Sequence, residues 1–161
     1  MDTTLNYGGT TMILHQDNQF IYNYRAAIKL PNGMAIDYSH EVEFTDEFRL
    51  IAPDGSFKLS FGFITVEKSA QTFTEEIYEH FDQITAIEPV YRVETASGLS
   101  GYATSYDIGD ELCEEFAIDL TGATHALFYA RLWRLKKDEK TYDDVLYKSV
   151  KKELLASIKE L

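Results

Sequence analysis

The chain has 161 residues, of which 45% are hydrophobic and 26% charged, and its formal net charge is −12. A chain of this length is expected to fold as one domain, residues 1–161, with a full hydrophobic core. The acidic balance argues against nucleic-acid phosphates and anionic membrane surfaces as partners. Residues 1–130 hold 21 acidic and 6 basic residues, whereas residues 131–161 hold 6 acidic and 9 basic ones. This division predicts a solvated acidic body and a C-terminal helix with a basic face; the alternative is an acidic surface for a basic partner.

The single cysteine, Cys113, excludes an intrachain disulfide and a cysteine-based metal cluster. The first residues lack the basic and apolar regions of a signal peptide. No run of apolar residues is long enough to predict a membrane span. We therefore expect a cytoplasmic protein.

Short strands are predicted in the N-terminal part of the chain. Residues 1–10 contain Gly8-Gly9 and are expected to be a loose lead-in. A short strand is predicted from Thr11 to Leu14 and a longer one from Phe20 to Leu30, which ends at the turn Pro31-Asn32-Gly33. Residues 34–44 read as an extended piece.

The segment from Phe48 to Lys68 is typical of a β-hairpin. Pro53-Asp54-Gly55 marks the turn, because proline presets φ and glycine accepts a positive φ. Large apolar side chains then follow with a period of two, at Phe57, Leu59, Phe61 and Phe63. We expect the helix that begins a few residues later to cover this face.

That helix is predicted from Ser69 to Thr85. Thr72 and Glu75 have the spacing of a capping box, in which each side chain bonds a backbone N–H that the helix leaves unpaired. An apolar stripe follows the helix at Phe73, Ile77, Phe81 and Ile84.

Four antiparallel strands and a second helix are predicted in the rest of the chain. The strands, separated by turn-type dipeptides, are Val90–Thr95, Tyr102–Ile108, Leu112–Leu120 and Ala126–Leu135. The last strand is apolar on both faces, which predicts a central position covered on both sides. The final helix is expected to be capped by Thr141 and to bury a stripe formed by Leu146, Val150, Leu154 and Ile158.

These elements predict an α+β fold: a single domain with an antiparallel sheet of about six or seven strands flanked by helices. Several features recur in the PsbP-like fold family: Leu30-Pro31-Asn32-Gly33, Pro53-Asp54-Gly55, the helix at 72–84, the pattern from Val93 to Tyr102, and the final helix ending at Leu154–Ile158. In element order the chain resembles this family, which joins the photosystem PsbP proteins, a Ran-release factor of nuclear transport and bacterial DcrB-type proteins. The resemblance implies an α/β/α sandwich and a binding protein, adaptor or chaperone-like factor. It assigns no functional residue.

No sequence motif predicts catalysis, a cofactor or a metal ion. Glu76 and His80 share a helix face, but a metal site needs further ligands, and a surface ion pair explains the spacing better. Cys113 lies among carboxylates, which raise a thiol pKa and oppose nucleophilic attack. A pairing of Cys113 with His125 would require a hairpin to bring the two side chains together.

The candidate partner surface combines two tyrosines with an acidic cluster. Its residues are Tyr102, Tyr106, Asp110, Glu111, Glu114 and Glu115. The acids lack the spacing of a calcium-binding loop, so a charged hairpin tip is the preferred interpretation. The tyrosines either form an aromatic patch for a partner or lie buried under the C-terminal helix.

The expected function is therefore that of a non-catalytic adaptor or chaperone-like domain that binds another protein. The alternative is a small-molecule binding domain with an apolar pocket between the sheet and a helix. An enzyme that uses isolated carboxylates or His80 is the third hypothesis, and a homodimer formed through the tyrosine-rich face also stays open.

Overall fold

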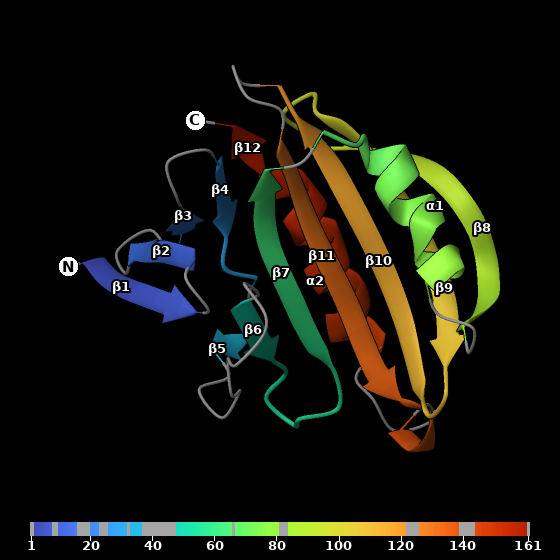
Figure 1. Ribbon diagram of the computed structural model, residues 1–161. Coiled ribbons are helices and arrows are strands. Elements are labelled where there is room, and N and C mark those ends of the chain that lie inside the picture. The colour runs from blue at the N-terminus through green and yellow to red at the C-terminus, as the bar shows by residue number, and fades with distance from the viewer. Residues whose placement is uncertain are drawn as a thin grey trace.

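The described part of the computed structural model consists of two antiparallel sheets and two α-helices (Figure 1). The structure describes residues 2–7, 10–15, 20–22, 26–31, 33–36, 48–65, 67–80, 84–121, 126–138 and 144–160. The predicted α+β fold, a single domain with an antiparallel sheet and packed helices, is confirmed.

The larger sheet has seven strands. In spatial order they are β5 (Ala35–Ile36), β6 (Phe48–Ile51), β7 (Lys58–Thr65), β11 (Ala126–Leu135), β10 (Glu111–Leu120), β9 (Ser100–Ile108) and β8 (Ile84–Glu94). The predicted meander is therefore present, and β11 is central between β7 and β10, as its two apolar faces predict. A short 3-10 helix, Lys136–Asp138, follows β11.

The edge strand β8 is longer than the predicted strand Val90–Thr95, since it begins at Ile84. It contains Pro89, and its register against β9 shifts on either side of Glu88. Proline and bulges are tolerated at a sheet edge, because one side of an edge strand makes no hydrogen bonds to a neighbouring strand.

The smaller sheet contains the N-terminal strands and one short C-terminal strand. In spatial order they are β1 (Asp2–Tyr7), β2 (Thr10–His15), β3 (Phe20–Tyr22), β4 (Ala26–Lys29) and β12 (Lys159–Glu160). The expectation that residues 1–10 are a loose lead-in is corrected, because β1 pairs with β2 over its whole length. The single strand expected from Phe20 to Leu30 is two strands, which pair with each other as a hairpin.

The β6–β7 hairpin forms as predicted. Gly55 has a φ of 74°, the left-handed conformation that glycine adopts without a side-chain penalty. The turn is closed by a hydrogen bond from the Gly55 N–H to the Ala52 carbonyl at 2.9 Å. The Asp54 carboxylate also accepts a bond from the Ser56 N–H at 3.0 Å, which stabilises the reversal.

The apolar face of this hairpin is covered by the last helix, not by the first one as expected. Phe57 packs edge-on against Tyr147 of α2 (Asp144–Ser157), with 5.2 Å between ring centroids. Phe57, Phe61 and Leu154 are buried in one cluster. Side chains alternate along the strand, so Lys58 and Ser60 lie on the opposite face, where both contact Trp133. The cap expected at Thr141 lies outside the described residues.

Helix α1 (Ala70–His80) covers the other face, over β8, β9 and β10 (Figure 1). It is shorter than predicted because Ile84 already belongs to β8. Its cap is also not the predicted Thr72–Glu75 box. Ser69 Oγ accepts a hydrogen bond from the Thr72 N–H at 3.2 Å, and Asp119 of β10 accepts one from the Ala70 N–H at 2.9 Å.

Neither α1 nor α2 is long and apolar enough to cross a membrane.

Candidate functional site

The two tyrosines of the predicted partner surface lie under α1, not under the C-terminal helix. Tyr106 is 3% exposed and packs with Ile77 and Cys113. Its ring meets that of Tyr78 edge-on at 6.4 Å. Tyr102 is half-buried against the apolar cluster at the start of α1. The structure therefore places Tyr106 in the interior of the protein.

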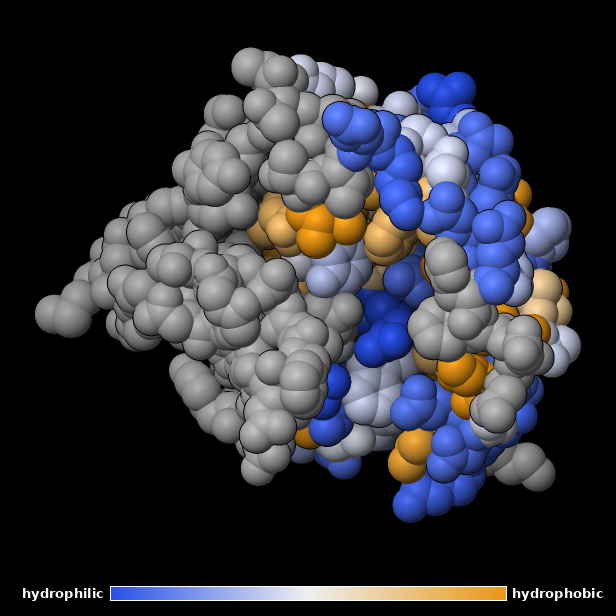
Figure 2. Space-filling model, in the orientation of Figure 1, coloured by the Kyte–Doolittle hydropathy of each residue, from blue (hydrophilic) through white to orange (hydrophobic). Residues whose placement is uncertain are grey.

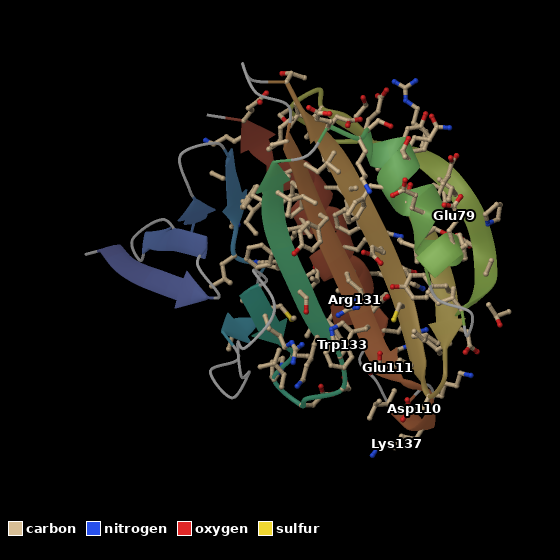
Figure 3. The ribbon with its side chains drawn as sticks, viewed as in Figure 1. Glu79, Asp110, Glu111, Arg131, Trp133 and Lys137 are labelled. Carbon is tan, nitrogen blue, oxygen red and sulfur yellow. The ribbon has the colours of Figure 1, made fainter. Side chains whose placement is uncertain are left out.

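The four acids of the same set lie in three different environments. Asp110 and Glu111 occupy the end of the β9–β10 hairpin, away from α1 (Figure 3). Glu114 faces α2, where its carboxylate pairs with Lys151 Nζ at 3.0 Å. Burial lowers the pKa of Lys151, but Glu114 and Tyr91 together outweigh it and the pKa is raised. Glu115 alone lies beside Tyr106, so the six predicted residues do not share one surface.

Glu115 and Tyr106 do line a cleft between α1 and the sheet. The cleft has a volume of about 250 Å³, and its lining residues are Lys68, Phe73, Glu76, Ile77, Tyr106, Glu115 and Arg131. In Figure 2 this region is a hollow with strongly hydrophilic atoms at its floor and hydrophobic side chains on either side. A concave site with apolar walls and a few converging polar groups is the usual form of a ligand pocket.

The floor of the cleft belongs to a polar row that crosses the sheet. Ser60 of β7 lies opposite Arg131 of β11, which lies opposite Glu115 of β10, which in turn lies opposite Thr104 of β9. Ser60 and Thr104 are buried. Opposite charges directly across an antiparallel pair stabilise the sheet, so the Arg131–Glu115 pair fits its position.

Tyr106 orients the Glu115 carboxylate. The Tyr106 hydroxyl donates a hydrogen bond to Glu115 Oε2 at 2.7 Å. Burial, followed by the negative charge of Glu115, raises the pKa of Tyr106 far above its ordinary value. The phenol therefore stays protonated and acts as a donor that holds one carboxylate oxygen in place.

An ion pair closes the rim of the cleft. Lys68 Nζ lies 2.5 Å from Glu76 Oε2, and the two side chains are 40% and 28% exposed. The sequence predicted a surface ion pair between Glu76 and His80, but the side chain of His80 lies outside the described residues. The apolar wall is Phe73 and Ile77 of α1, and Phe73 packs against Tyr129 at 5.8 Å between centroids.

Trp133 extends the site along β11. It lies two residues after Arg131, so both side chains are on the face of β11 turned toward α1 (Figure 3). The guanidinium of Arg49 and the ammonium of Lys58 lie over the indole, 5.1 and 5.4 Å from its centroid. The indole N–H donates to Ser60 Oγ at 3.4 Å. Trp133 is thus half-buried at an edge of the site.

Cys113 is unsuited to nucleophilic chemistry. It is 2% exposed, and burial raises its pKa to about 12, with Glu111 and Glu115 contributing in the same direction and Arg131 opposing them. The carboxylates predicted this direction, but burial is the larger cause. His125 lies outside the described residues, as do the side chains of the other histidines. Within the described part of the chain, no group of three metal-binding side chains comes together.

The sequence did not identify Arg131 and Lys68 as residues of the candidate site. A signal for Arg131 was present, because it is a charged residue within a largely apolar strand whose other charged residue, Arg134, lies next to the strand end. Nothing in the sequence pointed to Lys68, since only the fold brings it to the same cleft as Arg131.

No protein-family model matches the sequence, and no curated protein matches it. Among solved structures, a crystal structure from Bacteroides thetaiotaomicron VPI-5482 is similar over 84% of this chain and 45% of that chain, at 10% sequence identity and a TM-score of 0.41. The chain therefore spans less than half the length of that protein. A likeness of this size assigns no family and no function.

Proposed function

We propose that this chain is a non-catalytic binding domain and that its ligand is a small molecule held in the cleft between α1 and the sheet. The observation that carries the proposal is the cleft itself, in which charged side chains from three elements converge beside the apolar wall of α1. The pocket is small, which suits a compact ligand better than a protein segment.

Binding is favoured over catalysis by the chemical state of the lining groups. A general acid or base works best when its pKa lies near the operating pH. Burial raises the pKa of Tyr106, which lines the cleft, far from neutrality, and it also raises the pKa of Cys113, which packs against Tyr106 behind the lining, so neither group ionises near neutral pH. The proton on Tyr106 serves to orient Glu115.

A small molecule is favoured over a protein partner, the function first expected from the sequence, by the surface of the described residues. Within that surface the exposed large hydrophobic residues are Ile87 on β8 and Val145 on α2, which belong to different elements. Protein interfaces usually contain a contiguous apolar or aromatic centre. The PsbP-like family remains a proposal, supported by the two helices that lie on opposite faces of the sheet.

Thermal-shift screening of a metabolite library tests the proposed function, since a ligand that binds only the folded state raises the unfolding midpoint. Phe73→Ala removes part of the apolar wall and is expected to abolish the ligand-induced shift. Val145→Ala, at an exposed position on α2, is the matched control and should retain it. If no compound raises the midpoint of the native protein, or if Phe73→Ala responds like Val145→Ala, the cleft is not the site.

A further inference from the structure

We propose that the cleft between α1 and the sheet binds an electrically neutral small molecule, with an apolar body against α1 and a hydroxyl or amide group beside the charged floor. This inference rests on the proposed function and adds to it the chemical class of the ligand. It is argued from the balance of charge in the cleft, the partners of its charged groups and the position of the apolar wall.

The charged side chains that line the described part of the cleft sum to zero. Lys68 and Arg131 are cations, and Glu76 and Glu115 are carboxylates. The whole chain, in contrast, has a net charge of −12. An anion would therefore be repelled by the body of the protein and would meet no excess of positive charge in the cleft, and a cation would meet no excess of negative charge there.

The two charges at the rim are paired with each other. Lys68 Nζ lies 2.5 Å from Glu76 Oε2, and the two side chains are 40% and 28% exposed. A charged ligand would compete for one partner of this pair and leave the other without its counterion, which costs free energy in a partly buried place. A neutral ligand leaves the pair intact.

The two charges at the floor also have protein partners. Glu115 lies directly opposite Arg131 in the β10–β11 ladder, where opposite charges stabilise a sheet. The Glu115 carboxylate also accepts a hydrogen bond from the Tyr106 hydroxyl at 2.7 Å. A ligand ion at the floor would have to displace these partners, whereas a neutral group would not.

A hydroxyl or an amide suits such a floor because it both donates and accepts hydrogen bonds. It can lie beside a carboxylate or beside a cation without adding net charge to the cleft. The protein uses the same chemistry itself, since the buried hydroxyl residues Ser60 and Thr104 flank the two charged residues of the polar row.

The apolar body of the ligand is placed by α1. Phe73 and Ile77 form the wall, and the Phe73 ring packs against that of Tyr129 at 5.8 Å between centroids. The volume of about 250 Å³ accommodates a single ring with a short chain. Because the charges of the cleft add no net attraction, burial of this body is the main favourable contribution to binding.

The test uses three probes with one phenylpropyl frame and different charges: the neutral 3-phenylpropan-1-ol, the anion 3-phenylpropanoate and the cation 3-phenylpropylammonium. Titration calorimetry measures the affinity of the native protein for each at neutral pH. We expect the alcohol to bind about tenfold or more tightly than either ion, because an ion loses hydration without gaining a counterion in the cleft. The affinity for the alcohol should not change as the salt concentration rises.

Substitutions at the rim should change the preference in opposite directions. Glu76→Gln gives the cleft an excess positive charge and should raise its affinity for 3-phenylpropanoate about two- to fivefold. Lys68→Gln gives it an excess negative charge and should do the same for 3-phenylpropylammonium. The double variant Lys68→Gln/Glu76→Gln is balanced again and should restore the preference for the alcohol.

Arg92→Gln and Glu94→Gln are the matched controls. The two residues form an exposed pair on β8 at 3.0 Å, with side chains that are 64% and 67% exposed. Each control changes the net charge of the chain as much as the corresponding rim variant but leaves the lining of the cleft unchanged. Neither should alter the relative affinities for the three probes.

Equal affinity for the three probes, or tighter binding of either ion to the native protein, would overturn the assignment of a neutral ligand. The proposed cleft would still stand if Phe73→Ala weakened that binding. Binding that neither Phe73→Ala nor the rim variants change would place the ligand elsewhere and contradict the proposed function as well. Binding of none of the three probes would overturn the inferred ligand class, and the library screen would then decide the proposed function.

Discussion

The two faces of the seven-stranded sheet differ in what they bury. On the α2 face, aromatic and aliphatic side chains from β7, β10, β11 and α2 form one continuous cluster. On the α1 face, the apolar contacts are divided into two smaller clusters. The polar row from Ser60 through Arg131 and Glu115 to Thr104 crosses that face.

This difference suggests a division of labour between the faces. Continuous apolar burial contributes most to stability, because the hydrophobic term scales with the area removed from water. Charged groups in a partly buried face cost desolvation and contribute specificity instead. We expect substitutions on the α2 face to change mainly the free energy of unfolding, and those around Arg131 to change mainly binding.

The largest expected effect is that of Phe128→Ala. Phe128 is fully buried and its ring lies 5.1 to 6.4 Å from those of Phe61, Phe63 and Phe116. Loss of a ring from such a cluster costs about 3–5 kcal/mol of unfolding free energy, measured by urea denaturation. A loss below about 1 kcal/mol would show that the α2 face is not the main core.

A pair of truncations compares the two helices directly. Leu154 of α2 is 0% exposed and Ile77 of α1 is 9% exposed. We expect Leu154→Ala to cost about 2–5 kcal/mol, and Ile77→Ala to cost less because it borders the cleft, where surrounding groups can relax. The midpoints of urea unfolding decide the comparison. The reverse order would contradict the assignment of stability to the α2 face.

Alkaline pH is expected to lower the unfolding free energy of the protein through Cys113 on the α1 face. The folded protein holds the Cys113 proton up to a pKa of about 12, whereas the unfolded chain releases it near the ordinary value of 9.0. Stability is therefore unaffected by this group below about pH 9 and falls by up to about 1.4 kcal/mol per pH unit between the two values. Tyr106, whose pKa is also raised, acts in the same direction at higher pH.

Unfolding of the wild type and of Cys113→Ala, measured from about pH 8 to about pH 11, isolates the cysteine contribution. The variant should lose less stability over this interval than the wild type. Parallel pH profiles would show that Cys113 ionises in the folded protein as readily as in the unfolded chain.

The smallest expected effect concerns the exposed pair Arg92–Glu94 on β8, whose side chains are 64% and 67% exposed. Arg92→Ala should change the unfolding free energy by less than about 0.5 kcal/mol. A larger loss would mean that the edge strand depends on this pair for its register.

The parts of the fold that depend only on neighbouring residues were predictable from the sequence. The turn at Asp54-Gly55 predicted the hairpin, and the two apolar faces of β11 predicted a central strand, because both signals are read from neighbouring residues. By contrast, local signals did not predict which helix covers the apolar face that contains Phe57 and Phe61. Both helices have a suitable apolar stripe. Which of them covers this face depends on the side of the sheet on which the connecting segments place each helix.

The candidate site was harder to predict than the fold. Tyr106 and Glu115 were both identified as candidates, but Tyr106 was assigned either to a partner surface or to burial under the C-terminal helix, because a sequence pattern does not show what packs above a strand. Lys68 and Arg131 come to the same cleft only when the layers of the structure are assembled. The cap supplied by Asp119 to Ala70 is equally non-local, and it displaced the capping box expected at Thr72.

The pairing of β7 with β11 has a consequence for how the chain is synthesised. β7 ends at Thr65, and its partner does not begin until Ala126. During translation, β7 leaves the ribosome with one edge unpaired and must wait while α1, β8, β9 and β10 are made. An open strand of this kind is a template for pairing with other chains. We therefore expect slow translation or truncation before β11 to cause aggregation, and chaperones to engage the nascent chain in this interval.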